Sequence, residues 1–401
     1  MPLPYSRQTV GGDEAAAVAE AVRAPWLTGG PTLARFEAAL AESVGARFAV
    51  AVSRGTAALH VAYRAAGVGP GDTVLTSPIT FVATASAAVY CGATPAFADV
   101  DARGALDAAA VARFVAARGT PRAVVPVHYA GHPAALEAIA AAAPGAVLIE
   151  DACHALGADY RAAAGTWHRV GACAHAAMAV FSFHPVKSIT TGEGGAVLTN
   201  DAALAERCRR LRDHGLVRTP AADDTGWDGP WYYELHEPGF NYRMTDLQAA
   251  LGLVQLGRLR TFVHRRRTLA AAYDLALAAL PAVRRVGPAL HTRSAYHLYP
   301  VRVPAAVRRP VFELLRAAGI GVQVHYVPVH LQPYYRGLLG TAPGALPAAE
   351  AFYAEVLSLP CFPEMEDADV KHVTATLAEA LDACGAGDGA GGEGKHADQP
   401  W

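Results

Sequence analysis

The sequence predicts an α/β protein in two parts: a large domain with a mostly parallel sheet flanked by helices, and a smaller C-terminal α+β domain. Three observations predict this class. Segments with strand alternation and segments with helical spacing follow one another regularly from about residue 46 to residue 200. After a long helical segment, strands and helices then follow in mixed order. Hydrophobic residues make up 52% of the 401 residues and charged residues 17%, which is enough apolar material for a large core.

Composition and charge exclude several classes of protein. The formal net charge is −2, so no basic excess points to nucleic acid. The six cysteines form no CxxC pair, which indicates reduced thiols rather than a disulfide framework or a zinc site. The N-terminus lacks a signal-peptide pattern, and no apolar run reaches the roughly eighteen residues of a membrane span. We therefore expect a cytoplasmic protein with no nucleic-acid or membrane partner.

The N-terminal part predicts an arm, a helix, a strand and a second helix. Phe36 and Leu40 belong to a run with helical spacing, residues 48–52 alternate as a strand does, and a helix begins near Gly55. A strand, a glycine turn and a helix N-terminus form an anion site, because free N–H groups and the helix dipole point at the ligand. Gly55 and Thr56 would then hold a phosphate. Alternatively, they only cap the helix.

A second unit follows, with strands at 71–78 and 94–101 around a helix at 80–92. In a parallel sheet flanked by helices, active residues collect at the carboxyl ends of the strands. Phe81 lies at such an end. Its ring either stacks on a bound aromatic ring or packs into the core.

The strand at 122–131 and a helix at 133–143 lead to an apolar strand that ends in Glu150 and Asp151. A carboxylate at the mouth of a parallel sheet costs desolvation energy unless it has a cationic partner. A protonated pyridine nitrogen is such a partner. Asp151 is the better candidate, because alternation along the strand points Glu150 the other way.

The stretch Phe181–Gly195, FSFHPVKSITTGEGG, carries one lysine, Lys187, and leads into an apolar strand. A lysine becomes a nucleophile toward carbonyls when its ammonium group is partly desolvated. Lys187 is placed for that role, although it can also be a surface lysine in a loop between two strands.

This stretch resembles the cofactor-lysine segment of the DegT/DnrJ/EryC1/StrS family of nucleotide-sugar aminotransferases, which depend on pyridoxal 5′-phosphate. The resemblance implies the fold of fold type I transferases. It also implies that Lys187 binds the cofactor covalently, that Asp151 pairs with the ring nitrogen, and that His154 reaches the phenolic oxygen. Ser182 would hold the phosphate beside Gly55 and Thr56. The order Asp151, His154, Lys187 repeats the family pattern in order and spacing.

Other segments extend the resemblance over roughly residues 1–384. GFNYRM matches a family motif whose asparagine crosses the dimer interface to the cofactor phosphate of the partner, so Asn241 would act in trans in a homodimer with shared active sites. Alternatively, Asn241 is a turn residue before a helix. Tyr5 resembles an N-terminal tyrosine near the sugar, or packs its ring against the domain. His325 and Tyr326 lie in a VHY segment that the family places near the active site, and we assign them with Tyr5 and His184 to substrate binding.

The C-terminal part predicts a linking helix at 262–283, strands at 295–303 and 321–330, and a helix at 308–320. We divide the chain into a large cofactor-binding domain with its arm (1–260), a small domain (261–384) and a disordered tail (385–401). Residues 219–238 form a long irregular segment, a kind that is usually functional or mobile.

Two histidine pairs suggest a metal site: His128 with His132, and His325 with His330. No acidic residue or cysteine accompanies either pair at a usual spacing, so we expect no metal.

The resemblance implies a transaminase. L-glutamate would give its amino group to the cofactor, leaving pyridoxamine phosphate, which would pass it to a UDP-4-keto-6-deoxy-N-acetylhexosamine. The branch with the closest motifs makes UDP-4-amino-4,6-dideoxy-N-acetyl-β-L-altrosamine for pseudaminic acid biosynthesis. Four alternatives remain: another keto sugar nucleotide, a sugar dehydratase, a sugar-responsive binding or regulatory protein, and a nicotinamide-dependent dehydrogenase. Lys187 argues against the dehydratases, which carry histidine at its position, and no GxGxxG follows the first strand.

Overall fold

The computed structural model describes residues 2–218, 229 and 231–386. It contains a seven-stranded sheet in the order β1-β9-β8-β5-β4-β2-β3. β9 runs antiparallel to both of its neighbours, and the other neighbouring pairs are parallel, so the predicted mostly parallel sheet is confirmed. The strands are β1 (Phe48–Val52), β2 (Thr73–Thr76), β3 (Thr94–Phe97), β4 (Ala123–Val125), β5 (Val147–Asp151), β8 (Met178–Ser182) and β9 (Gly195–Thr199).

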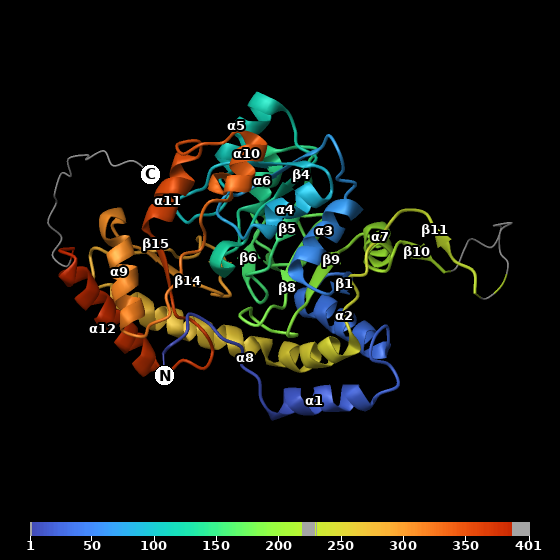
Figure 1. Cartoon of the computed structure of the whole chain (residues 1–401), viewed down its shortest axis with the longest axis horizontal. Coiled ribbons are helices and arrows are strands. Elements are labelled where there is room, and N and C mark those ends of the chain that lie inside the picture. The colour runs from blue at the N-terminus through green and yellow to red at the C-terminus, as the bar shows by residue number, and fades with distance from the viewer. Residues whose placement is uncertain (1, 219–228, 230, 387–401) are drawn as a thin grey trace.

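Helices cover both faces of this sheet, which makes a three-layer α/β/α unit (Figure 1). One face packs against α3 (Gly55–Ala65), α4 (Ala83–Tyr90) and α7 (Ala202–Arg212). The other packs against α2 (Pro31–Val44), α5 (Ala108–Arg118), α6 (Leu136–Ala142) and α8 (Asp246–Leu277). α1 (Gly12–Arg23) lies along the outer side of α8 (Figure 1). Each face of the sheet therefore has its own apolar core.

α8 is one continuous helix of 32 residues, so the linking helix predicted at 262–283 is the second half of a longer helix. Thr245 and Gln248 form a capping box at its start, and no proline or loop residue interrupts it. The carboxylate of Asp246 also accepts hydrogen bonds from the backbone N–H groups of Gly30 and Thr32 at the start of α2. The domain boundary at residue 260 stays a prediction, and it falls inside this helix.

The second half of α8 carries a smaller α+β unit, as predicted (Figure 1). Its three-stranded antiparallel sheet, β12-β14-β15, packs with α9 and α12 on α8. The elements are β12 (Arg284–Arg285), β14 (Tyr299–Arg302), β15 (Val356–Leu359), α9 (Ala305–Ala317), α10 (Pro333–Leu339), α11 (Pro347–Glu355) and α12 (Asp367–Ala383).

Short elements complete the described chain. A second three-stranded sheet joins β13 (Thr292–Arg293), β6 (Asp159–Arg161) and β7 (Trp167–Arg169), and a hairpin joins β10 (Leu216–Val217) and β11 (Glu234–Leu235). The 3₁₀ turns are η1 (Tyr129–Gly131) and η2 (Val329–Leu331). Most of the predicted irregular segment 219–238, and the predicted tail from residue 387 on, lie outside the described residues.

The strand predicted at 321–330 is wrong. This segment makes one isolated bridge, between Gln323 and Ser358, and ends in η2. Its alternating apolar residues imitate a strand, but Pro328 has no N–H to donate to a ladder. Side chains hold the segment instead: the ring of His325 is hydrogen-bonded to Ser358, and the hydroxyl of Tyr326 to His154.

The two edges of the large sheet differ in how their backbone groups are occupied. On β3, Thr94 and Ala98 donate their N–H groups toward β2. The backbone nitrogens of Pro95 and Phe97 therefore point away from the sheet. On β1, the N–H of Ala51 donates to Glu37 at 2.8 Å and its carbonyl accepts from Arg212 at 2.7 Å. At the β1 edge, side chains thus bond the outward backbone groups of Ala51. At the β3 edge, Pro95 occupies one of the outward positions.

In the described part of the chain, no helix combines the length and the apolar character that crossing a bilayer requires.

Candidate active site

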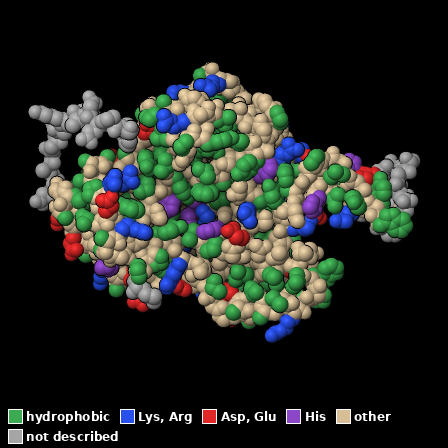
Figure 2. Space-filling model, viewed as in Figure 1, with side chains coloured by type: hydrophobic (Ala, Val, Ile, Leu, Met, Phe, Trp, Pro, Cys, Tyr) green, Lys and Arg blue, Asp and Glu red, His purple; other side chains and the backbone are tan. Residues whose placement is uncertain are grey.

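The carboxyl ends of β5 and β8 open into a cavity of about 440 Å³. On the face shown in Figure 2, histidine side chains gather near the centre, beside charged ones. The cavity is lined by eleven of the residues singled out in the sequence: Tyr5, Gly55, Thr56, Phe81, Asp151, His154, Ser182, His184, Lys187, His325 and Tyr326. Asn241 is exposed and is not among the described residues that line it.

Lys187 lies in the turn after β8, where its backbone N–H donates to the carbonyl of His184 at 2.9 Å. Its side chain is partly buried in the cavity wall. Burial lowers the pKa of the Lys187 ammonium, an effect that the nearby Cys153 and Asp151 partly oppose. A lysine in this position loses its proton more readily than one in water, and the neutral amine is the nucleophile.

Asp151 and Glu150 point to opposite sides of β5, as the alternation predicts. Asp151 lies in the cavity wall, where its two oxygens accept hydrogen bonds from the Thr84 hydroxyl at 2.6 Å and the Cys153 N–H at 3.2 Å. Glu150 is fully buried away from the cavity and is paired with the ring of His128 at 3.0 Å. Of the two carboxylates, only Asp151 can meet a ligand.

His154 lines the same cavity as Phe81. Its Nε2 lies 3.1 Å from the hydroxyl of Tyr326, and its ring centroid lies 4.4 Å from that of His297. Burial and the charge of Lys187 hold the pKa of His154 well below its usual value. The imidazole is therefore neutral and able both to donate and to accept a hydrogen bond. Its Nδ1 is buried without a partner among the described residues.

The N-terminus of α3 and Ser182 form a narrow cradle. Arg54, the residue before the helix, is extended, and no side chain caps the first N–H groups of α3. A Cβ atom placed on Gly55 would lie 2.8 Å from the Cβ of Ser182, closer than such atoms approach. Glycine is required here because the helix start and β8 come so close together. Free backbone donors beside a hydroxyl suit a phosphate.

The predicted substrate residues come from three parts of the chain. Tyr5 is held by the hydrogen bond from the Cys361 N–H to its carbonyl, and its ring lies 5.5 Å from that of His325. The ring of Phe81, which is 57% exposed, lies 6.2 Å from that of Tyr326. Burial lowers the pKa of His325 to about 4 and raises that of Tyr326 well above its usual value. These two rings are uncharged hydrogen-bonding groups at neutral pH.

Among the residues of this cavity that sequence reasoning missed are His297 and Thr84. His297 is 2% exposed and packs against His154, and burial holds its pKa well below the usual value. Thr84 donates to Asp151. His297 lies in the segment 295–303, whose pattern predicts only a strand. For Thr84, its place one turn after Phe81 was the available signal.

The histidine pairs considered for metal have other partners. His132 is hydrogen-bonded to Ser294 and the Val286 carbonyl, and His330 to Glu350. Across the described residues, no three His, Cys, Asp or Glu side chains group as metal ligands.

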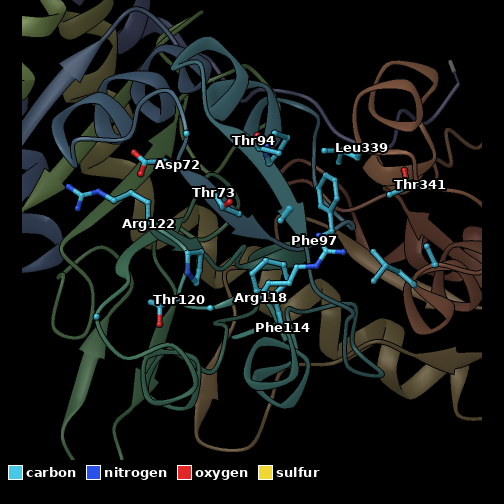
Figure 3. Close-up of a pocket in the computed structure, with 18 residues that line it drawn as sticks. Asp72, Thr73, Thr94, Phe97, Phe114, Arg118, Thr120, Arg122, Leu339 and Thr341 are labelled. Atoms are coloured by element: carbon cyan, nitrogen blue, oxygen red, sulfur yellow. The ribbon is translucent and has the colours of Figure 1, made fainter. Parts of the chain in front are cut away.

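A larger cavity, of about 790 Å³, lies at the opposite, amino ends of β2 and β3. Figure 3 shows its lining, with Asp72 and Thr73 on one side and Phe97, Phe114 and Arg118 on another. It contains none of the predicted site residues. Volume alone therefore does not identify the functional cavity of this chain.

Comparisons with known proteins agree with this site. A model of the DegT/DnrJ/EryC1/StrS aminotransferase family matches residues 8–378. The chain is 40% identical to the spore coat polysaccharide biosynthesis protein SpsC of Bacillus subtilis (strain 168), over 94% of this chain and 97% of that protein. Its structure is similar to that of Helicobacter pylori PseC, an aminotransferase involved in the biosynthesis of pseudoaminic acid (TM-score 0.87, 32% identity, 96% of this chain and 100% of that one). Spr1654 of Streptococcus pneumoniae, solved in a PLP form, is 27% identical with a TM-score of 0.85, over 96% of this chain and 99% of that one.

Proposed function

The chain belongs to the DegT/DnrJ/EryC1/StrS aminotransferase family, and on that premise we propose that it moves an amino group from L-glutamate to the C4 keto group of a UDP-4-keto-6-deoxy-N-acetylhexosamine. It is a pyridoxal-phosphate-dependent sugar aminotransferase. The proposed product is UDP-4-amino-4,6-dideoxy-N-acetyl-β-L-altrosamine, for pseudaminic acid. The observation that carries the proposal is the meeting of Asp151, His154 and Lys187 in one cavity.

The residues of the cavity fit pyridoxal phosphate. Lys187 supplies an amine with a lowered pKa for the aldehyde carbon, and Asp151 supplies an anion for the ring nitrogen. The cradle of Gly55, Thr56 and Ser182 supplies donors for the phosphate. When bound, the cofactor serves as the electron sink that lets a proton leave the donor Cα.

Each residue has a proposed task. Asp151 would keep the ring nitrogen of a bound cofactor protonated, His154 would contact its phenolic oxygen, and Phe81 would cover its ring. Lys187 Nζ would move the proton to and from the donor Cα, which requires a base held within reach of that atom. Burial, which lowers the pKa of Lys187, favours the neutral amine that this task requires.

One wall at the substrate end of the cavity is uncharged. Tyr5, His325 and Tyr326 form a wall of neutral hydrogen-bonding groups, which suits the hydroxyl and acetamido groups of a sugar ring. His184, exposed at the mouth, completes the proposed sugar contacts.

We further propose a cytoplasmic homodimer with shared sites, in which Asn241 of the partner subunit reaches the cofactor phosphate. Its exposed side chain within one subunit supports this reading.

An absorbance spectrum tests the proposal. The protein loaded with pyridoxal phosphate should show a visible band that bleaches on addition of L-glutamate and returns with the 4-keto sugar nucleotide. A band that bleaches but does not return would reject the proposed sugar substrate but agree with a transaminase. A protein that stays colourless with added cofactor would reject the proposed function.

A second candidate keeps the chemistry and changes the sugar. Identity to SpsC, a spore coat polysaccharide biosynthesis protein, is 40%, against 32% to PseC. Return of the band with a different keto sugar nucleotide, and not with the N-acetylhexosamine, would select this candidate.

A further inference from the structure

Three buried side chains form a line of hydrogen bonds that ends on Asp151. The Thr84 hydroxyl donates to Asp151 Oδ2 at 2.6 Å, and Thr80 Oγ1 lies 2.8 Å from Thr84 Oγ1. Thr80 is 2% exposed, Thr84 1% and Asp151 5%, so solvent is nearly excluded from all three. In such surroundings a hydrogen bond to a carboxylate is stronger than in water.

The geometry fixes the direction of each bond. Thr84 has a single hydroxyl proton, and three acceptors lie within reach: Asp151 Oδ2 at 2.6 Å, Thr80 Oγ1 at 2.8 Å and the Phe81 carbonyl at 3.3 Å. The carboxylate is nearest and charged, so the proton goes there. Thr84 Oγ1 must then accept from Thr80, and the order of donation runs from Thr80 through Thr84 to Asp151. Each bond polarises the next along such a line.

These bonds also fix the plane of the carboxylate. The second oxygen of Asp151 accepts from the Cys153 N–H at 3.2 Å. Each oxygen thus has one donor, from different elements, and rotation about the bond to the carboxyl carbon would break both. Each oxygen keeps a lone pair for one further partner.

Thr84 is itself held by the helix that carries the phosphate cradle. The hydroxyl of Tyr63, in α3, donates to the Thr84 carbonyl at 2.9 Å, and Tyr63 has no exposed surface. Phe81 lies one turn before Thr84. Thr84 therefore links the helix that begins at the cradle, through Tyr63, to the carboxylate of Asp151.

We propose that Thr84 is a positioning residue, supported by Thr80, that holds the Asp151 carboxylate in the orientation required by the ring nitrogen of the cofactor. This inference rests on the proposed pairing of Asp151 with that nitrogen. It assigns a task to the threonine pair that packing alone does not require, because isosteric valines would fill the same volume.

The test compares Thr84→Val, which removes the hydroxyl at constant shape, with Thr84→Ser, which keeps it. Thr76→Val is the matched control: Thr76 is fully buried in β2, and its hydroxyl donates to the Val125 carbonyl rather than to Asp151. Apoprotein is titrated with pyridoxal phosphate, the visible band is followed against pH, and the melting temperature of the apoprotein is recorded.

We expect Thr84→Val to weaken cofactor binding about 10-fold to 100-fold, the loss of one hydrogen bond to a charged group, and to change the pH dependence of the band. Thr84→Ser should stay within about 3-fold of the wild type in affinity, because the hydroxyl is kept. Thr76→Val should lower the melting temperature without changing either cofactor property. Thr80→Val removes only the hydrogen bond from Thr80 to Thr84, so its cofactor affinity should lie between those of the wild type and Thr84→Val. It serves in place of Thr84→Val if that variant does not fold.

Wild-type affinity and spectrum in a folded Thr84→Val protein, or equal losses in Thr84→Val and Thr84→Ser, would overturn the inference. If Thr84→Val does not fold, wild-type affinity in Thr80→Val would do so. Failure of the wild type to bind the cofactor would instead reject the proposed function.

Discussion

At the scale of single residues, burial shifts the pKa values of the basic and the acidic groups of the site in opposite directions. Burial lowers the pKa of Lys187 and of His154, and it raises that of Tyr326. All three shifts favour the uncharged form. The cavity therefore combines groups whose uncharged forms are favoured by burial with the carboxylate of Asp151.

The first prediction concerns Lys187. Lys187→Ala should retain the fold and lower turnover by about 10³-fold or more, because one group that both binds the cofactor covalently and moves the proton is lost. Steady-state rates, with the melting temperature as a check of folding, measure this. Turnover within about 10-fold of the wild type would show that another base serves the reaction.

At the scale of elements, sequence reasoning succeeded where an element carries its own signal. α3 begins at Gly55, as predicted, because a glycine turn before a helix is a local feature. Sequence reasoning failed where contacts between distant parts of the chain determine the local structure. The segment 321–330 alternates like a strand, yet it is held by side chains that reach Ser358 and His154. The same reasoning explains why His297 was missed: only the folded chain brings it to His154.

The second prediction concerns the start of α3. Gly55→Ala would place a Cβ atom 2.8 Å from that of Ser182 and force the cradle apart. We expect cofactor affinity to fall about 10-fold or more, since one charge-assisted hydrogen bond or more is lost. Gly257→Ala is the control: Gly257 lies in α8 with open space around its Cα, and alanine there should raise stability by up to about 1 kcal/mol. Equal cofactor titrations for both variants would contradict the proposed cradle.

At the scale of the whole molecule, buried neutral histidines make stability depend on pH. His132, 5% exposed, has its pKa lowered to about 4, mainly by burial, and the same holds for His60. Unfolded histidines titrate near their ordinary value of about 6.5. Between these values the unfolded chain binds more protons than the folded one, so this stability is present above about pH 6.5 and is lost as pH falls toward 4.

The third prediction follows from this sign. The free energy of unfolding should fall between pH 7.5 and pH 5.5 by about 1 kcal/mol or more for each such histidine. His132→Gln should lower stability at pH 7.5 but reduce that fall, whereas His372→Gln, at an exposed position of α12, should follow the wild type. Denaturant unfolding at both pH values measures the difference. An undiminished fall in His132→Gln would show that other groups cause it.

The fourth prediction concerns the proposed dimer. If Asn241 acts in trans, mixing Asn241→Ala subunits with Lys187→Ala subunits creates dimers in which one site carries both changes and the other carries none. With random exchange, about a quarter of wild-type activity per subunit should return, although each parent is nearly inactive. Verified mixed dimers without activity would place Asn241 in its own subunit's site, and a fully active Asn241→Ala parent would place it outside the chemistry.

The sheet edges have a consequence for behaviour at high protein concentration. An open edge strand can template pairing with another molecule, which begins aggregation. At β1, Glu37 and Arg212 already hold the N–H and carbonyl of Ala51. At β3, the outward position Pro95 has no N–H to offer, so an approaching strand would find a single outward donor, Phe97. The features that end this sheet on either side therefore leave a strand of a neighbouring molecule fewer backbone groups with which to pair.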